Sequence, residues 1–356
     1  MAKKFGDLQA KHDVGTVVTN LEKELASTKA ELDIQTFVGK VLGTLDLGKA
    51  LPAWPAAKAV DGGSPGIPTL FLSDLHWGER VYKEQVRGVN EYSLKIAHAR
   101  LEHTVNTAIY LLKILDDKLR YPGIVVPLGG DMISGDIHEE LATTNELPSI
   151  PTVLDLHDAL VPAIRLLADT FGRVFLPCVS GNHGRNTRKI QAKNRNRTSF
   201  DWMLYQFLLR SFATDDRVTF FIPEGPDALY RVANTTYDLT HGDQFRAGDS
   251  IIGAIGPLMR GNQKKTAKHA SVHQPYDVML AGHWHTYIHL ARMIINGTTK
   301  GYDEYADSNN YLVEPPQQAL WVTHEKFDIN WRMPVLCEAP KARAKSVDWV
   351  AVSRQG

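Results

Sequence analysis

A carboxylate and an imidazole follow a short apolar segment near residue 70. Residues Thr69 to Leu72 read as a buried strand, which leads into Asp74 and His76. Two such side chains, two residues apart and just past a strand end, can both point at one metal ion. The pair alone is a weak signal, because Asp-x-His occurs often by chance. The signal becomes stronger if other strands in the chain also end in residues of the metal-ligand type.

Four later segments do so, since each is a predicted strand that ends in residues able to bind a metal ion. These strands are predicted within residues 124–128, 174–180, 236–240 and 277–281. They end in Asp131, in Asn182 and His183, in His241, and in His283 and His285. Taken singly, such residues are usually turn, capping or surface residues. Their recurrence at five strand ends favours one shared metal site.

The ordered series resembles the motifs of the calcineurin-like metallophosphoesterase superfamily, and is closest in type to its DNA-repair nuclease branch. That family reads Asp-x-His, Gly-Asp, Gly-Asn-His, a single His and Gly-His-x-His, in this order. The matching blocks are Ser73-Asp74-Leu75-His76, Gly130-Asp131, Gly181-Asn182-His183, Thr240-His241-Gly242 and Gly282-His283-Trp284-His285. The resemblance covers residues 70–285, and residues 1–68 lie outside it.

The elements that must position these residues alternate between strand and helix in the first half of the chain, and are mostly strands in the second. Amphipathic helices are predicted at residues 91–120, 153–170 and 199–213, and further strands near 218–222, 229–233, 287–295 and 319–323. This order indicates an α/β fold with one sheet packed on another. The resemblance implies a four-layer α-β-β-α sandwich. In α/β folds, ligands bind beyond the carboxyl ends of the strands.

The chemistry of the family explains the residue types. Two divalent ions, about 3.5–4 Å apart, clamp a phosphate, and a metal-bound hydroxide attacks it in line. We expect Asp131 to bridge the two ions, because a shared carboxylate offsets their repulsion. The resemblance implies that Asp74, His76 and His285 complete one ligand shell and that Asn182, His241 and His283 complete the other. Mixed imidazole and oxygen ligands suit manganese first, with iron, zinc and magnesium as alternatives.

His183 is expected to be catalytic rather than a metal ligand, because its imidazole can stabilise phosphoryl oxygens or protonate the leaving group. Two departures from the family concern its surroundings. Many relatives carry a carboxylate directly after the Asn-His pair, where this chain has Gly184, and another where it has Ser134. We therefore predict that Ser134 or Asp136 contacts His183. Glu79 has no ligand role in this interpretation, and either supports the site or faces the substrate.

Basic residues gather directly after His183. Residues 185–197 carry six cationic and no acidic side chains, and a second basic segment covers residues 260–269. The predicted substrate contacts are Arg185, Arg188, Lys189, Arg195 and Arg197. Such a run is either a solvated surface or a track for the phosphates of nucleic acid, and its position beside the site raises the second interpretation to even weight.

Three functions remain open at this point. The first is a phosphodiesterase, a nuclease acting on DNA, for which the basic run would bind the substrate. The second is a phosphomonoesterase acting on a nucleotide or a phosphoprotein. The third is a catalytically weak scaffold that assembles through an N-terminal helix. The intact series of metal-ligand types argues against the scaffold, because we know of no structural need for it without a metal.

Domain boundaries are predicted from composition. Residues 1–45 form a helical extension, 46–68 a linker rich in proline and glycine, 69–338 the metallophosphoesterase domain and 339–356 a solvated tail. The predicted helix over residues 17–45 either packs on its own domain or makes a homodimer contact.

Composition sets limits on location and partners. Lysine plus arginine equals aspartate plus glutamate at 40 each, so no global field draws the 356-residue chain to nucleic acid or membrane. No apolar run approaches the ~20 residues that span a bilayer, and we see no secretory signal. Two cysteines suit a reducing compartment. We expect a cytoplasmic protein with no membrane contact.

Overall fold

The computed structural model of the chain describes residues 18–19, 21–26, 28–29, 65–245 and 254–339. The described residues before position 30 are helical. The rest of the predicted extension, most of the linker and nearly all of the tail lie outside the described residues, so the homodimer contact and the domain boundaries stay predictions. The first strand begins at Ile67, within the segment that we assigned to the linker.

One sheet has six strands in the order β11-β10-β1-β2-β3-β4. Its strands are β1 (Ile67–Phe71), β2 (Ile124–Val125), β3 (Val174–Pro177), β4 (Val218–Phe221), β10 (Gln317–His324) and β11 (Asp328–Leu336). Strands β1 to β4 run parallel to one another, β10 pairs antiparallel with β1, and β11 pairs antiparallel with β10. Strand β11 was not predicted, and it carries Pro334, a residue that suits only a sheet edge.

The second sheet has five strands in the order β5-β6-β7-β9-β8. These are β5 (Asp227–Val232), β6 (Thr235–Thr240), β7 (Val278–Ala281), β8 (Ile288–Leu290) and β9 (Met293–Ile295). Strands β6, β7 and β9 are parallel, so the segments after β6 and β7 leave the same edge of the sheet. The strand that we predicted at 287–295 is instead the antiparallel pair β8 and β9.

Helices cover the outer faces of both sheets. The long ones are α2 (Leu94–Leu115), α4 (Ser149–Phe171), α5 (Phe200–Ser211) and α6 (Ile255–Ser271), and the short ones are α3 (Glu139–Thr144), α7 (Glu304–Ser308) and the 3₁₀ turn η1 (Asn196–Thr198). Ser93 and Ser199 begin α2 and α5 by accepting hydrogen bonds from backbone N–H groups, as N-caps do. None of the described helices is long and apolar enough to cross a membrane.

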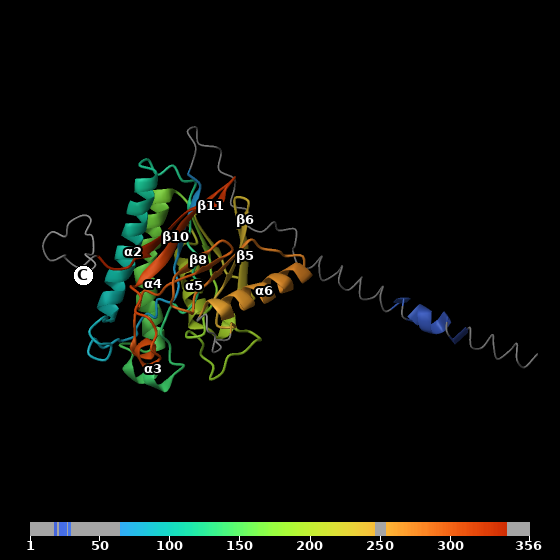
Figure 1. Cartoon of the computed structure of the whole chain (residues 1–356), viewed down its shortest axis with the longest axis horizontal. Coiled ribbons are helices and arrows are strands. Elements are labelled where there is room, and N and C mark those ends of the chain that lie inside the picture. Colours follow the sequence, from blue (N-terminus) through green and yellow to red (C-terminus); the bar gives the residue numbers. More distant parts are fainter. Residues whose placement is uncertain (1–17, 20, 27, 30–64, 246–253, 340–356) are drawn as a thin grey trace, which may run out of the picture. The chain divides into compact units, whose positions relative to one another are not determined.

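Three apolar cores separate four layers, which confirms the predicted α-β-β-α sandwich. Leu70 packs among the residues of α2 and α4, whereas its neighbour Phe71 points to the other face and packs between the sheets. Phe245 and Leu258 form the third core, between α6 and the second sheet. Figure 1 shows α2 and α4 on one side of the sheets and α6 on the other.

Candidate metal centre

The seven predicted ligands lie together on the segments that follow β1, β2, β3, β6 and β7. They are Asp74, His76, Asp131, Asn182, His241, His283 and His285. Asp74, His76, Asp131 and His241 are at most 1% exposed. Because these strands end at the same edge of their sheets, residues far apart in the sequence meet there.

The first group consists of Asp74, His76 and His285, whose side-chain atoms lie close enough to hold one ion. The Nε2 atom of His285 lies 3.0 Å from Nε2 of His76 and 3.5 Å from Oδ1 of Asp74. Asp74 is fixed by Ser73, whose hydroxyl donates to its Oδ2 over 2.5 Å, and by the backbone N–H of His283 over 2.8 Å.

The second group consists of Asp131, His241 and His283, with Asn182 beside them. The Nε2 atom of His241 lies 3.0 Å from Oδ2 of Asp131 and 3.1 Å from Oδ1 of Asn182. Its other ring nitrogen, Nδ1, lies 2.9 Å from the carbonyl oxygen of Gly129. A carbonyl only accepts, so Nδ1 carries the hydrogen there.

These residues fit a divalent metal ion. The Nε2 atom of His241 faces two oxygen acceptors, and two Nε2 atoms face each other between His76 and His285. Either a proton on the ring nitrogen or a metal cation among these atoms relieves the repulsion of such converging lone pairs, and, against the lowering effect of burial, Asp131 raises the pKa of His241 to about 10. Imidazole, carboxylate and amide donors are also the set that a transition metal takes. Asp131 also lies within reach of His76 and His183, next to the first group, as a bridging ligand would.

The backbone at the site is strained. Asp74, His76, Asp131, His283 and His285 have φ angles of 53°, 46°, 48°, 69° and 50°. Non-glycine residues seldom adopt this left-handed conformation, and it persists where the surrounding structure imposes it. Glycines allow the close approach of the loops, since a Cβ atom on Gly282 would lie 2.2 Å from Oδ2 of Asp74.

His183 lies beside the two groups. Its backbone N–H donates to Oδ1 of Asp131 over 2.7 Å, and its ring centroid lies 4.6 Å from that of His76. Its Nδ1 atom lies 2.9 Å from the carbonyl oxygen of Ser134 and therefore carries a hydrogen there. This leaves Nε2 as the ring atom that can act on a substrate.

These contacts confirm the predicted contact with His183 for Ser134 but not for Asp136. Ser134 contacts His183 through its backbone carbonyl rather than through its side chain. Asp136 instead accepts a hydrogen bond from the hydroxyl of Ser149 over 2.7 Å, at the start of α4. It does not orient His183 in the part of the chain that the structure describes.

Asp201 explains why position 184 is a glycine. A Cβ atom on Gly184 would lie 2.7 Å from Oδ1 of Asp201. The Asp201 carboxylate is buried and accepts from the backbone N–H groups of Asp131, Met132 and Gly181 over 3.1, 3.2 and 2.9 Å. Burial raises its pKa to about 6. Sequence reasoning missed it, because an acidic residue in the first turn of a helix usually needs no further explanation.

A buried ionic cluster supports the first group. Lys300 is 3% exposed, and its Nζ lies 2.9 Å from Oε1 of Glu79 and 2.5 Å from Oδ2 of Asp303. The other oxygen of Glu79 lies 3.3 Å from Nδ1 of His76. Lys300 and Asp303 were missed, since no motif marks them and they lie over 200 residues from Glu79.

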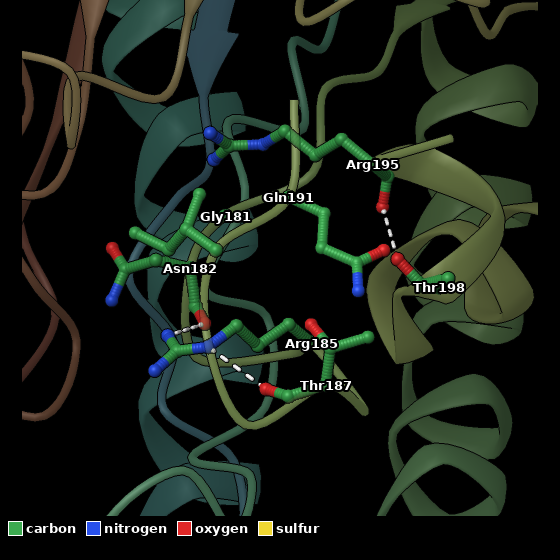
Figure 2. Close-up of a pocket in the computed structure, with 8 residues that line it drawn as sticks. Gly181, Asn182, Arg185, Thr187, Gln191, Arg195 and Thr198 are labelled. Carbon is green, nitrogen blue, oxygen red and sulfur yellow. Dashed lines mark hydrogen bonds between the residues drawn. The ribbon is translucent and has the colours of Figure 1, made fainter. Parts of the chain in front are cut away.

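The basic residues divide into two kinds. Arg195 forms a double hydrogen bond with Asp243, and Arg197 pairs with Glu224, so carboxylates offset both charges. Arg185 is held by the carbonyls of Thr187 and Asn182. It lines a small pocket beside Asn182, and Figure 2 shows it there, reaching back to the backbone oxygen of Asn182. Arg188 and Lys189 have no ion pair among the described residues.

Two residues of the second basic segment are engaged inside the protein rather than at its surface. Lys265 is buried on α6, where its Nζ lies 2.5 Å from Oδ1 of Asp227 and 3.6 Å from Oδ2 of Asp238. His269 is buried against the same two carboxylates. Both side chains are therefore engaged inside the protein, whereas Arg260, Lys264 and Lys268 are exposed.

No protein-family model and no curated protein matches this sequence. Solved structures that resemble it include a zinc complex of Vps29 from Entamoeba histolytica, with 10% identity, a TM-score of 0.29, and coverage of 76% of this chain and 100% of that one. A predicted phosphoesterase from Streptococcus pneumoniae has 10% identity, a TM-score of 0.27, and coverage of 76% and 98%. The sulfate thiohydrolase SoxB from Thermus thermophilus has 11% identity, a TM-score of 0.30, and coverage of 78% and 57%. Similarities this distant do not identify a function, so the function has to be inferred from the residues of the site.

Proposed function

We propose that this chain is a phosphoesterase of the calcineurin-like metallophosphoesterase type that uses two divalent metal ions. The observation that carries the proposal is the meeting of seven ligand-type residues in two groups beside a common carboxylate, Asp131. Left-handed backbone at five of the seven supports the proposal, because such conformations gather at functional sites, although seven other described residues also adopt it.

Each residue has a definite task in this proposal. Asp74, His76 and His285 would hold one ion, Asn182, His241 and His283 the other, and Asp131 both. Bound ions would clamp the phosphate and lower the pKa of a water molecule that attacks it. His183 presents Nε2 toward the substrate, since its Nδ1 is held by Ser134, and it would stabilise phosphoryl oxygens or protonate the leaving group. Manganese remains the first candidate from the donor set.

The substrate that we propose is a phosphodiester, with DNA as the first candidate. Support comes from Arg185 at the pocket beside Asn182, and from Arg188 and Lys189 on the same loop, which form no ion pair with the described residues. Contacts from such cations supply affinity for polynucleotides without sequence preference. Arg195 and Arg197 contribute less than the sequence suggested, because each already has a carboxylate partner.

A phosphomonoesterase is the second candidate. Arg195, Arg197 and Lys265 each form an ion pair with a carboxylate of the same chain. Fewer free cations then remain for the phosphates of a long substrate, which favours this candidate. A small phosphate ester requires only the metal centre and a nearby cation such as Arg185.

An activity screen tests the proposed function. We expect manganese to stimulate hydrolysis of DNA and of bis-p-nitrophenyl phosphate, and we expect Asp131→Ala and His76→Ala to lose about 10²-fold or more of that activity, in line with the loss of one major stabilising group. The screen compares manganese, magnesium and zinc on single- and double-stranded DNA. Far higher efficiency on p-nitrophenyl phosphate would select the monoesterase. No hydrolysis of any phosphate ester would refute the proposal.

A further inference from the structure

We infer that Glu79 is a positioning residue that orients both His76 and His183, in place of the two carboxylates that this chain lacks at positions 184 and 134. The inference rests on the proposed function, because it assigns Glu79 a task in the same metal centre. It goes further in naming one carboxylate that couples a metal ligand to the catalytic histidine.

The contact with His76 is direct. Oε2 of Glu79 lies 3.3 Å from Nδ1 of His76, while Nε2 of His76 faces His285. Histidines that bind a metal through one ring nitrogen commonly present the other to a carboxylate or a carbonyl, which fixes the tautomer and the ring. Both side chains are buried, so water does not compete for this contact. Nδ1 of His76 forms no hydrogen bond with the described residues as they stand, and Glu79 is the carboxylate placed to accept from it, which would leave Nε2 for an ion.

The contact with His183 passes through Ser134. The hydroxyl of Ser134 donates to Oε2 of Glu79 over 3.2 Å, and the carbonyl of Ser134 accepts from Nδ1 of His183 over 2.9 Å. The backbone N–H of Ser134 also donates to the carbonyl of Trp77 over 3.0 Å. The turn that contains Glu79 therefore fixes Ser134 through its side chain and its backbone. The fixed carbonyl of Ser134 in turn sets the orientation of the His183 imidazole.

Lys300 keeps the Glu79 carboxylate charged and in place. A buried carboxylate without a partner is strongly destabilising, so it needs a cation or donors close by. Lys300 takes one oxygen, Oε1, and leaves Oε2 to His76 and Ser134. Asp303 fixes Lys300 from the other side. This division of the two oxygens lets one carboxylate anchor itself and act on two histidines.

The usual position after the Asn-His pair is closed to a carboxylate. Any side chain at Gly184 would collide with Asp201, which fixes the backbone of Asp131 and Gly181. Ser134 is too short to replace the missing charge, yet its hydroxyl reaches Glu79. In this chain the negative charge therefore comes from Glu79, in the turn after β1.

The test uses Glu79→Gln in the full chain, with manganese binding followed by titration calorimetry. We expect the affinity for one of two metal equivalents to fall about 10–100-fold, as for other carboxylates behind a metal-bound histidine, while the second equivalent stays unchanged. We also expect the Nδ1 proton signal of His183, seen by NMR in the metal-free protein, to weaken through faster exchange with water. A residue that only supports folding would change neither quantity in a folded variant.

Glu84→Gln is the matched control, because Glu84 is exposed on the same turn region, and it should match the wild type. Glu79→Asp covers the case in which the glutamine variant does not fold. It keeps a negative charge in the cluster but draws the carboxylate back from His76, so the same loss of metal affinity is expected in a variant that still folds.

The outcomes separate the two proposals. A wild-type chain that binds no divalent metal would overturn the proposed function itself. A wild type that binds two equivalents, beside folded Glu79 variants with wild-type metal affinities and an unchanged His183 signal, would overturn only the role of Glu79.

Discussion

At the scale of single residues, the site depends on side chains that hold other side chains. Asp131 and His241 are proposed metal ligands. Asp201 accepts a hydrogen bond from the backbone N–H of Asp131, and Glu79 contacts the ring nitrogen of His76 that faces away from the site. Such supporting contacts determine whether a set of ligand types becomes a set of usable ligands.

Gly184→Asp tests this support, because it restores the residue that many relatives carry. We expect the variant to be less stable by about 1–3 kcal/mol, since its Cβ would lie 2.7 Å from Oδ1 of Asp201 and a core rarely absorbs an inserted group. Urea unfolding measures the change. Gly225→Ala is the control, because no atom lies within 4 Å of its Cβ position. A Gly184→Asp variant as stable as the wild type would show that Asp201 does not exclude side chains there.

At the scale of elements, helix α6 is attached to the second sheet through charges as well as through its apolar face. Lys265 lies between Asp227 on β5 and Asp238 on β6, and both carboxylates are largely or fully buried. Strand β6 continues into His241, so this attachment bears on the placement of a proposed metal ligand.

Lys265→Met should destabilise the protein by about 3 kcal/mol, the lower end of the cost of breaking a buried ion pair, because Lys268 and His269 stay beside the carboxylates. Lys264→Met, one residue away and exposed, should change stability by no more than about 0.5 kcal/mol. Unfolding midpoints of the two variants in urea make the comparison. Equal midpoints would mean that Lys265 contributes nothing to the attachment of α6.

The same pair of variants has a pH signature. Burial raises the pKa of Asp238 to about 6 in the folded protein, above the 3.8 of an ordinary aspartate. Its carboxyl group therefore holds a proton in the folded state at pH values where the unfolded chain has lost it, so this group's contribution to stability declines as pH rises from 3.8 through 6. The loss in Lys265→Met should be smaller at pH 5 than at pH 8, because a neutral Asp238 needs no cation.

At the scale of the whole molecule, much of the fold was predictable because hydrophobic periodicity reports local structure. The strands that carry the site and the helices α2, α4 and α5 follow apolar patterns that burial imposes. Helix α6 escaped prediction, since charged and polar residues fill most of its surface and it buries few apolar side chains. Strand β11 escaped for a similar reason, because alternate positions are exposed.

The residues of the candidate site also fall into those that local sequence patterns reveal and those that they do not. The ligand types were visible because they follow strands in a fixed order, and the structure brings them together. Glu79, Lys300, Asp201 and Asp303 were hidden or left open, because their contacts cross long stretches of sequence that no local pattern records. The basic residues show the converse, since a run of like charges did not reveal that Arg195 and Arg197 have acidic partners elsewhere.

The number of manganese ions bound per chain, measured by equilibrium dialysis and elemental analysis, tests the two-metal centre most directly. The proposed centre predicts two ions for the wild type. Asp131→Asn should bind fewer than one at the same free concentration, because the bridging carboxylate serves both sites. A wild type that binds one ion or none, or an Asp131→Asn variant that keeps two, would contradict the proposed centre.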